Sequence, residues 1–529
     1  MATLLSRSCS IIPPTTTRLV LTPVYPPNAS HFDALPEEII VKILEWCDVR
    51  GVFACQRACR TFRNVIEGSA GLRYKLALSE NGMCDEPRCR MTTAEKLELL
   101  TAHAAAWRRL HSVRPEWATS LVGWSTPAAV SGNFLVFTRT CNGTGCEHGA
   151  PVGVHLDLLV IRVPSPLRRI KGSQWMLWLP ANAGDLCIDA AQDLLIYVLN
   201  RTLCVRTLST DVVHPLVDGH SGSFKMWKGN LNRSFDVFNL CVCGDYVAAG
   251  TRIYFISVWN WKTGVIVSDQ ISEDVSFSSF DFLDEHHILY GDSSKDSIYV
   301  YDLRCGTELA TKADAGHRRF QLELPPIHRA TTSRYIQIRR NALSMRMQEQ
   351  TQHEHHAGDG GDTPPPPFHA DSRARLVVLR VVTSPVEFAE EQFELHIPAC
   401  ALLEHFAANK DARDLVLPWS AWCTDTNATP VRKLPYLMQP RMITYGMRAL
   451  SYPPNWDEGI LYLDSYPPRM TSAGRAGSRA GAETRQGIPL PDESPGEANF
   501  KSVLCEDALL CFQLDPSLIQ IKHAYWLTP

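Results

Sequence analysis

The sequence feature that most limits which fold this chain can adopt is a loose internal repeat, which lies after the first hundred residues. Each copy is an apolar segment, an acidic or glycine-containing turn, and a second apolar segment, and the first three copies recur every 40 to 50 residues. Two short apolar segments joined by such a turn predict an antiparallel hairpin. The copies lie at 186–198, 238–249, 277–290 and 503–512.

The length of the repeat indicates how the hairpins are arranged. A period near 40 residues with about four strands per unit is typical of a β-propeller. We expect this all-β region to span 118–529, which leaves roughly 350 residues after two insertions are removed, enough for a seven- or eight-bladed propeller. A pair of β-sandwiches is the competing architecture.

The two insertions are low-complexity segments at about 345–375 and 470–497. Both lack the apolar content that offsets the entropy of ordering a chain, so we expect them to be disordered surface loops. The first contains His353-Glu-His-His356, but position 357 is Ala, so the His-Glu-x-x-His zinc pattern is absent. Residues 1–31 are rich in proline, serine and threonine and are predicted to be a disordered tail.

The segment 32–78 is predicted to be helical, in contrast to the rest of the chain. Pro36 suits a first helical turn, and Glu37 and Glu38 follow where the helix dipole favours carboxylates. Apolar residues then recur at three- and four-residue spacing. Two more short helices follow, and residues 79–117 are expected to form a helical linker to the β region.

This helical segment has more apolar side chains than three short helices can bury. Leu35, Ile39, Ile43, Val52 and Phe53 cannot all point inward. Either the surplus binds a partner, or a later part of the chain covers it. The pattern alone leaves these two interpretations open.

The order and spacing of about ten residues resemble the F-box family. The matching stretches are Leu35-Pro-Glu-Glu-Ile39, Ile43-Leu44 and Cys55-Gln-Arg-Ala-Cys-Arg-Thr-Phe62, whereas Gly51 and Ala58 depart from the pattern. In that family the apolar faces of the helices bind a Skp-type adaptor, which connects to a cullin scaffold and a RING subunit. The resemblance implies these adaptor-binding positions: Leu35, Pro36, Ile39, Ile43, Leu44, Val52 and Cys55.

The β region carries a second, weaker resemblance. Val258-Trp-Asn260 and Val300-Tyr-Asp302, each followed by a turn glycine, are similar to degenerate forms of the ending of a WD-repeat blade. The Gly-His element of good WD repeats is absent. Trp259, Trp261, Trp419 and Trp422 are candidate aromatic anchors for a partner, although packing inside the blades is the simpler role for them.

Composition narrows the class of function. The formal net charge of −4 gives no general attraction to nucleic acid. No apolar run approaches the length that spans a bilayer, so we expect no membrane partner. The 17 cysteines are scattered and often lie in apolar runs, which favours free thiols and a cytoplasmic or nuclear location.

The sequence contains no recognisable catalytic, cofactor-binding or metal-binding motif. There is no nucleophile elbow, phosphate-binding loop or dinucleotide fingerprint. Cys84-x4-Cys89 and Cys141-x4-Cys146-Glu-His148 superficially resemble zinc ligands, but neither has the companion pair of a four-ligand site. We therefore expect no cofactor and no metal.

The resemblance predicts a non-catalytic substrate receptor of a ubiquitin ligase, with the F-box on the adaptor and the propeller on an unknown target protein. An interaction scaffold that uses the same helices outside any ligase is the alternative. A propeller hydrolase is a weaker third hypothesis, since it needs polar catalytic residues at the central channel.

Overall fold

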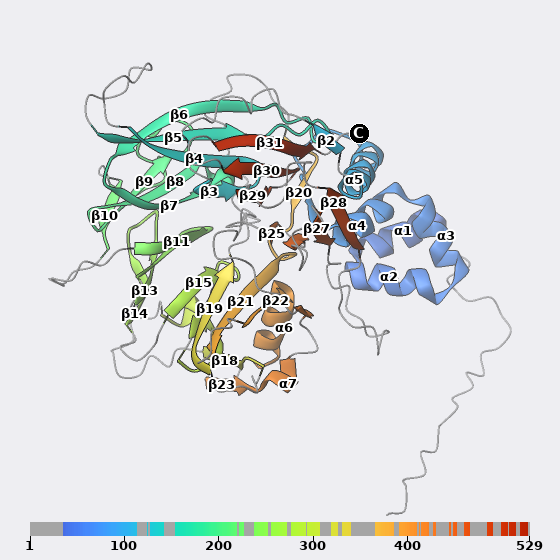
Figure 1. Ribbon diagram of the computed structural model, residues 1–529. Helices are drawn as coiled ribbons and strands as arrows, with labels where there is room; N and C mark the ends of the chain where they lie inside the picture. Colours follow the sequence, from blue (N-terminus) through green and yellow to red (C-terminus); the bar gives the residue numbers. More distant parts are fainter. Residues whose placement is uncertain are drawn as a thin grey trace, which may run out of the picture. The chain divides into compact units, whose positions relative to one another are not determined.

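The computed structural model of the chain forms two compact units, Met1–Ser69 and Ala70–Pro529 (Figure 1). The predicted tail 1–31 lies outside the described residues, as does His353–His356. The described residues are 35–109, 111–113, 124, 127–141, 154–219, 222–226, 237–251, 255–271, 277–292, 294–306, 319–325, 331–339, 365–385, 391–409, 412, 414–422, 427–429, 444–445, 448–451, 460–465, 484–489, 499–505, 507–514 and 519–526.

The described residues of the first unit form three short helices. They are α1 (Glu37–Trp46), α2 (Val49–Ala58) and α3 (Arg60–Gly68). Pro36 precedes α1 as predicted, and the backbone carbonyl of Pro36 accepts the first helical hydrogen bonds. The Asp48 side chain caps α2 by accepting from the Gly51 backbone N–H at 2.7 Å. The buried side chains of this unit are Ile40, Leu44, Val52, Val65 and Ile66.

The second unit contains seven sheets of four or five strands, which confirms the predicted all-β region (Figure 1). The first two sheets are built from β3 (Ala129–Ser131), β4 (Phe134–Cys141), β5 (His155–Arg162), β6 (Ser173–Pro180), and from β7 (Ala183–Asp189), β8 (Leu194–Leu199), β9 (Thr202–Thr207), β10 (Ser223–Lys225). The third and fourth are built from β11 (Val237–Cys243), β12 (Tyr246–Thr251), β13 (Phe255–Asn260), β14 (Ile266–Ile271), and from β15 (Phe277–Phe282), β16 (His287–Asp292), β17 (Ser297–Asp302), β18 (Arg319–Glu323), β23 (Asp414–Leu417).

The remaining three sheets complete the set. They are built from β19 (Thr331–Arg339), β21 (Leu376–Pro385), β22 (Glu391–Pro398), β24 (Asn427–Thr429); from β25 (Thr444–Tyr445), β26 (Arg448–Ser451), β27 (Ile460–Ser465), β28 (Thr484–Pro489); and from β29 (Asn499–Leu504), β30 (Ala508–Leu514), β31 (Ile519–Trp526), β2 (His111–Val113). Among the described strands, neighbours within a sheet pair antiparallel, except that β23 pairs with β18 in parallel.

The strand order gives a propeller with seven blades, one of the two predicted numbers. The first strands of successive sheets contact one another, from β3 to β7, β11, β15 and β19. The last sheet differs, because its outer strand β2 comes from the start of the unit and pairs with β31. A last blade built from strands of both ends of the unit ties the ring of blades together.

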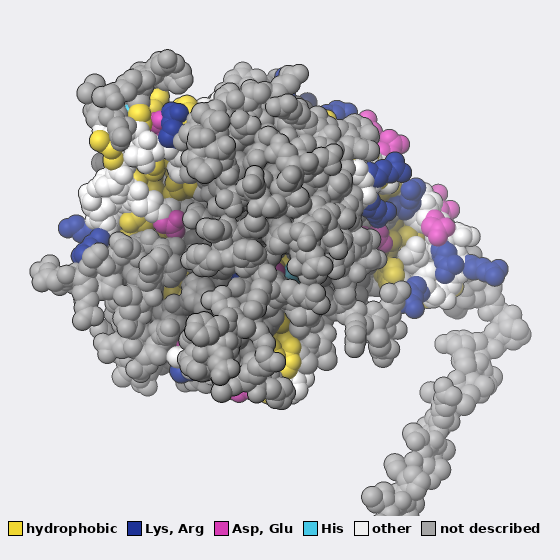
Figure 2. All heavy atoms as spheres, in the orientation of Figure 1, with side chains coloured by type: hydrophobic (Ala, Val, Ile, Leu, Met, Phe, Trp, Pro, Cys, Tyr) yellow, Lys and Arg dark blue, Asp and Glu magenta, His cyan; other side chains and the backbone are white. Residues whose placement is uncertain are grey.

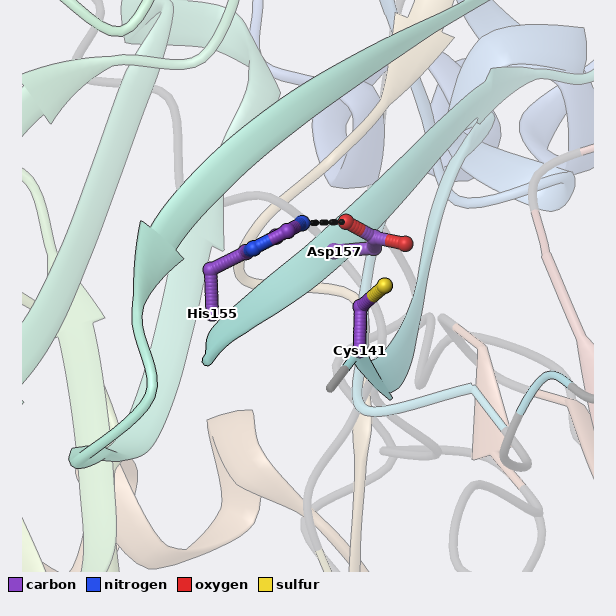
Figure 3. A group of neighbouring side chains, drawn as sticks. All are labelled: Cys141, His155 and Asp157. Atoms are coloured by element: carbon purple, nitrogen blue, oxygen red, sulfur yellow. Dashed lines mark ion pairs between the residues drawn. The ribbon is translucent and has the colours of Figure 1, made fainter. Parts of the chain in front are cut away.

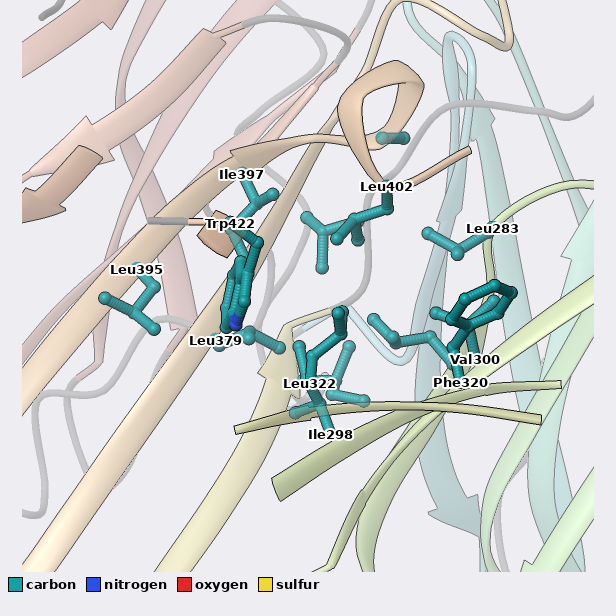
Figure 4. Packing of buried hydrophobic residues seen from close by; sticks show 14 of the residues in the cluster. Leu283, Ile298, Val300, Phe320, Leu322, Leu379, Leu395, Ile397, Leu402 and Trp422 are labelled. Carbon is teal, nitrogen blue, oxygen red and sulfur yellow. The ribbon is translucent and has the colours of Figure 1, made fainter. Parts of the chain in front are cut away.

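Hydrophobic cores lie between neighbouring blades. One core joins Val136 and Leu158 of the first blade to Leu186 and Tyr197 of the second. Another joins the fourth and fifth blades and includes residues of two short helices, α6 (Ala399–Ala408) and α7 (Trp419–Trp422) (Figure 4). Along the central strands whose side chains are described, such as β5 and β8, side chains alternate between two such cores, as expected for sheets that are covered on both faces.

The predicted helical linker is part of the second unit. Helices α4 (Ala70–Glu80) and α5 (Thr93–Trp107) pack together with β1 (Met83–Asp85) and β20 (Phe368–Ala370). Their core includes Leu100, Trp107, Phe368, Leu504 and Leu509, so α5 lies against the last blade. The segment 32–78 is thereby divided, because α4 belongs with the propeller and α1 to α3 do not.

Two predicted insertions are partly ordered. The segment 345–375 includes β20, which pairs with β1, and Arg375 near its end is buried. The segment 470–497 includes β28, which pairs with β27. The prediction of disorder was therefore wrong for these stretches, because partners distant in the sequence supply the contacts that local composition lacks. Residues 345–364, 470–483 and 490–497 lie outside the described residues.

A fully buried polar cluster fixes α5 to the blades. His103 Nε2 lies 3.0 Å from Asp507 Oδ1, and Asn133 Nδ2 donates to Asp507 Oδ2 at 2.7 Å. Arg168 Nη1 lies 3.3 Å from the same carboxylate. Burial of a carboxylate is costly unless it is paired and hydrogen-bonded. This cluster therefore specifies how the helix, the first blade and the last blade fit together.

The described helices include none that is both long and apolar enough to cross a membrane.

Candidate functional site

An apolar stripe runs along the solvent face of α1. Ile39, Ile43 and Trp46 are spaced by four and three residues, which places them on one side of the helix, and Leu35 lies two residues before its first residue. The exposed fractions of Leu35, Ile39, Ile43 and Trp46 are 36%, 47%, 46% and 90%. Nine large hydrophobic side chains are exposed in the described part of the chain, and these four are the ones that lie on α1 or directly before it.

The surroundings of the stripe are charged. Lys42 Nζ and Glu45 Oε2 form an exposed ion pair at 2.7 Å on the same helix. Figure 2 shows hydrophobic side chains between Lys, Arg, Asp and Glu over α1 to α3. An apolar face bordered by charged residues is typical of a surface that binds a protein partner.

The structure divides the seven predicted adaptor-binding residues into two groups. Leu35, Pro36, Ile39 and Ile43 are exposed, and Cys55 is half-buried. Leu44 and Val52 have exposed fractions of only 2% and 0%. We therefore assign these two to the core of the unit, where they support the stripe from behind.

The sequence prediction missed Trp46, the most exposed member of the stripe. The spacing in the sequence could have identified Trp46, because position 46 lies seven residues after Ile39 and thus on the same helical face. Tryptophan is enriched among the residues that dominate binding energy at interfaces. Trp46 therefore belongs to the candidate site.

The two departures from the family pattern lie at helix boundaries. A Cβ atom on Gly51 would meet Asp48 Oδ1 at 3.0 Å and Cys47 Cβ at 3.2 Å, so the first turn of α2 favours glycine. Ala58 is the last residue of α2, and the Cys59 Sγ accepts the Phe62 backbone N–H at 3.5 Å to cap α3. Neither departure disturbs the stripe.

Cys55 is not an activated thiol. Burial raises its pKa, and the neighbouring Cys47 and Cys59 raise it further. A cysteine with a raised pKa remains the neutral thiol at neutral pH and behaves as a small apolar side chain. Its role at this site is packing.

The family comparison identifies this unit. The family model of the F-box domain matches residues 32–71. These residues are an F-box domain. The match contains α1 to α3 and all seven residues that the resemblance assigned to adaptor binding.

Comparison with whole proteins adds little. No curated protein matches the chain. Solved structures with some similarity include HIRA(644–1017), at 16% identity over 34% of this chain and 52% of that chain, with a TM-score of 0.23. The C-terminal WD40 domain of Sif2 is 8% identical over 75% of this chain and 81% of that chain, with a TM-score of 0.34. BamB from Moraxella catarrhalis is 10% identical over 76% of this chain and 85% of that chain, with a TM-score of 0.30. The propeller assignment rests on the strand order of the blades.

Three of the four tryptophans considered as anchors on the propeller are core residues, and the fourth, Trp419, is half-buried and packs against the core between the fourth and fifth blades. Trp259, Trp261 and Trp422 are almost completely buried. The Trp261 indole N–H donates to the Gly244 carbonyl at 2.8 Å, and that of Trp422 donates to the Glu323 carbonyl at 3.0 Å. The prediction that they pack inside the blades is confirmed.

Proposed function

We propose that this chain is the substrate-recognition subunit of a Skp–cullin–F-box ubiquitin ligase and acts in the cytoplasm or the nucleus. The observation that supports the proposal most directly is the stripe of Leu35, Ile39, Ile43 and Trp46 inside a sequence that matches the F-box family. F-box domains generally bind Skp-type adaptors, and through the adaptor the chain meets the cullin and RING subunits.

The proposed mechanism needs no catalytic residue in this chain. The F-box holds the chain on the ligase, and the propeller holds a target protein. Tethering raises the effective concentration of the target lysines near the ubiquitin-charged enzyme. The propeller offers loops on a rigid scaffold, which is the usual place for selective binding.

Co-purification of adaptor and cullin from cells tests the proposal. The variant Leu35→Ala/Pro36→Ala alters exposed residues and leaves the core of Ile40, Leu44 and Val52 intact. We expect it to lose the adaptor and the cullin while the propeller stays folded. The matched control is Val212→Ala/Leu216→Ala, which removes two exposed apolar side chains of the second unit.

Two outcomes would contradict parts of the proposal. Normal adaptor binding by the Leu35→Ala/Pro36→Ala variant would show that the docking surface is misassigned. Adaptor binding without any cullin would favour the alternative, an interaction scaffold outside a ligase. Proximity labelling with and without a proteasome inhibitor then identifies the target, because a degraded partner accumulates only with the inhibitor.

A further inference from the structure

Three potential metal ligands meet at one end of the first blade. Cys141 is the last residue of β4, and His155 is the first residue of β5, directly opposite it in the strand pairing. Asp157 lies two residues further along β5 and is therefore on the same face of the sheet as His155. Figure 3 shows the three side chains together.

The donor atoms of this trio are close and largely withdrawn from solvent. One ligand atom from each residue lies within 4.8 Å of the others. His155 and Asp157 are 4% and 2% exposed, and Cys141 is half-buried. Two ligands of a tetrahedral zinc ion are about 3.3 to 3.6 Å apart, so the largest separation in the trio has to shorten by at most about 1.5 Å.

Asp157 is oriented as a metal-binding carboxylate would be. Arg139 holds one oxygen, with Nη2 at 2.8 Å and Nε at 3.2 Å from Oδ2. The other oxygen, Oδ1, is buried and accepts no hydrogen bond from the described part of the chain. His155 Nε2 lies 3.0 Å from Oδ1, a distance at which the two atoms form an ion pair only if the imidazole is protonated. Both donors therefore face the same small space.

The sulfur of Cys141 is engaged in a disulfide bond, whose other half lies outside the residues with described side chains. A disulfide sulfur is a poor ligand, whereas a thiolate binds zinc strongly. Thiolate, imidazole and carboxylate together suit Zn²⁺ better than Mg²⁺ or Ca²⁺, which prefer oxygen ligands alone.

We propose that Cys141, His155 and Asp157 form a zinc site that becomes available when the Cys141 disulfide is reduced. Two molecules of a small thiol such as glutathione are the reductant. They become one disulfide, and their two protons and two electrons convert the protein disulfide into two thiols. Zn²⁺ then replaces the proton of the Cys141 thiol, which goes to solvent, and water fills the fourth position.

The location gives the site a structural consequence. The same face of β4 and β5 continues into the core between the first and last blades, which includes Phe137, Leu159 and Ala508. A zinc ion bound by the trio would cross-link β4 and β5 at the edge of this seam. The inference is independent of adaptor binding, because all three ligands lie in the second unit.

The test measures zinc and cobalt binding by the full chain in both redox states. The protein is stripped of metal, and one half is reduced with a phosphine, which does not compete strongly for zinc. Affinity is measured by competition with a chromophoric chelator, and Co²⁺ is used to report thiolate ligation by its sulfur-to-cobalt charge-transfer absorption. We expect the reduced chain to bind one more equivalent of zinc than the oxidised chain.

Variants show whether these residues are the ligands. Cys141→Ser should abolish the charge-transfer band of this site, and Asp157→Asn should weaken zinc binding at least about tenfold while the band remains. The control Cys84→Ser removes another half-buried free thiol in the second unit and should change neither. Circular dichroism without metal checks that each variant is folded.

The proposal is overturned if the reduced wild-type chain binds no additional zinc, a result that depends on no variant. It is also overturned if Cys141→Ser binds zinc with unchanged affinity and spectrum. Should Cys141→Ser fail to fold, His155→Asn provides the second measurement, because it keeps the thiolate and must still lower zinc affinity.

Discussion

Trp46 is 90% exposed at the end of α1, so its indole contributes little to the stability of the F-box itself. Buried aromatic anchors commonly account for about 2 kcal/mol or more of binding energy at interfaces. We therefore expect Trp46→Ala to weaken adaptor binding by about thirtyfold, the equivalent of about 2 kcal/mol, without changing the unfolding midpoint. Titration calorimetry with the purified adaptor and thermal denaturation measure the two effects.

Val265→Ala is the matched control for Trp46, since Val265 is 60% exposed on the propeller. Its adaptor affinity should equal that of the wild type. If Trp46→Ala also binds normally, the adaptor does not contact the end of α1, and the stripe must be shortened to Leu35, Ile39 and Ile43.

His103 should make stability depend on pH. Burial lowers its pKa and outweighs the opposing effect of Asp507, so the folded chain keeps the ring neutral. The unfolded chain takes up a proton below a pH of about 6.5. Stability should thus fall as the pH decreases from 7 to 5, by at most about 1.4 kcal/mol per pH unit for this one group. Urea denaturation across this range measures the slope.

His103→Gln keeps a hydrogen-bond donor for Asp507 and removes the titrating group, so it should lose this part of the slope. Asn133→Ala is the control, because it removes another partner of Asp507 and no titrating group. It should lower stability at every pH and leave the slope unchanged. An undiminished slope in His103→Gln would show that other groups cause the pH dependence.

Asp507 should affect stability in a lower pH range than His103. Burial alone raises its pKa, but Arg168, His103 and Asn133 together hold it below the usual range. The stabilisation that it contributes is present above a pH of about 3.9 and is lost below that value. The two contributions can therefore be separated along the pH axis.

At the scale of single residues, the sequence predicted that α1 carries surplus apolar surface better than it predicted which way each side chain points. The periodicity of α1 indicated surplus apolar surface, and the structure exposes Leu35, Ile39 and Ile43. The periodicity could not distinguish these exposed residues from the buried Leu44 and Val52, because the direction of a side chain depends on how three helices pack. The zinc candidate was missed for a similar reason, since Cys141 meets His155 and Asp157 only through strand pairing.

Helix α5 begins with a reciprocal cap that should be measurable by itself. The Glu95 backbone N–H donates to Thr92 Oγ1 at 3.3 Å, and the Thr92 backbone N–H donates to Glu95 Oε2 at 2.7 Å. Removal of such a cap typically costs about 1 kcal/mol. Thr92→Ala should therefore lower the free energy of unfolding of the second unit by about this amount, as measured by urea denaturation.

Thr93→Ala is the control for the cap, because Thr93 is exposed and already inside the helix. Alanine is a good helix former, so this change should be neutral or slightly stabilising. Equal losses in both variants would mean that the cap is not the cause.

At the scale of elements, local hairpins were predictable and distant pairings were not. The four repeat copies in the sequence coincide with the first hairpin of four blades, at β7–β8, β11–β12, β15–β16 and β29–β30. In contrast, β1–β20, β18–β23 and β2–β31 join segments far apart in the chain. Hydrophobic pattern and turn residues specify a hairpin, but a short strand carries no signal that identifies a partner about a hundred or more residues away.

At the scale of the whole molecule, the closure of the propeller depends on the pairing of β2 with β31. The segment 79–117, predicted to be a linker, supplies three things to the propeller: the outer strand β2 of the last blade, the packing of Leu100 and Trp107, and the partner His103 of a buried carboxylate. Removing one partner of a buried charge is strongly destabilising. A propeller that begins after residue 117 would therefore lack its closure.

This argument predicts how two fragments behave. Fragment 70–529 contains the complete second unit and should be soluble and monomeric and unfold cooperatively. Fragment 118–529 exposes the edge of β31 and leaves Asp507 without His103, so we expect it to aggregate or to unfold at a much lower temperature. Size-exclusion chromatography and thermal denaturation compare them. Equal melting temperatures and monomeric elution for both fragments would show that β2 and α5 are dispensable, and that the seventh blade closes through its C-terminal strands alone.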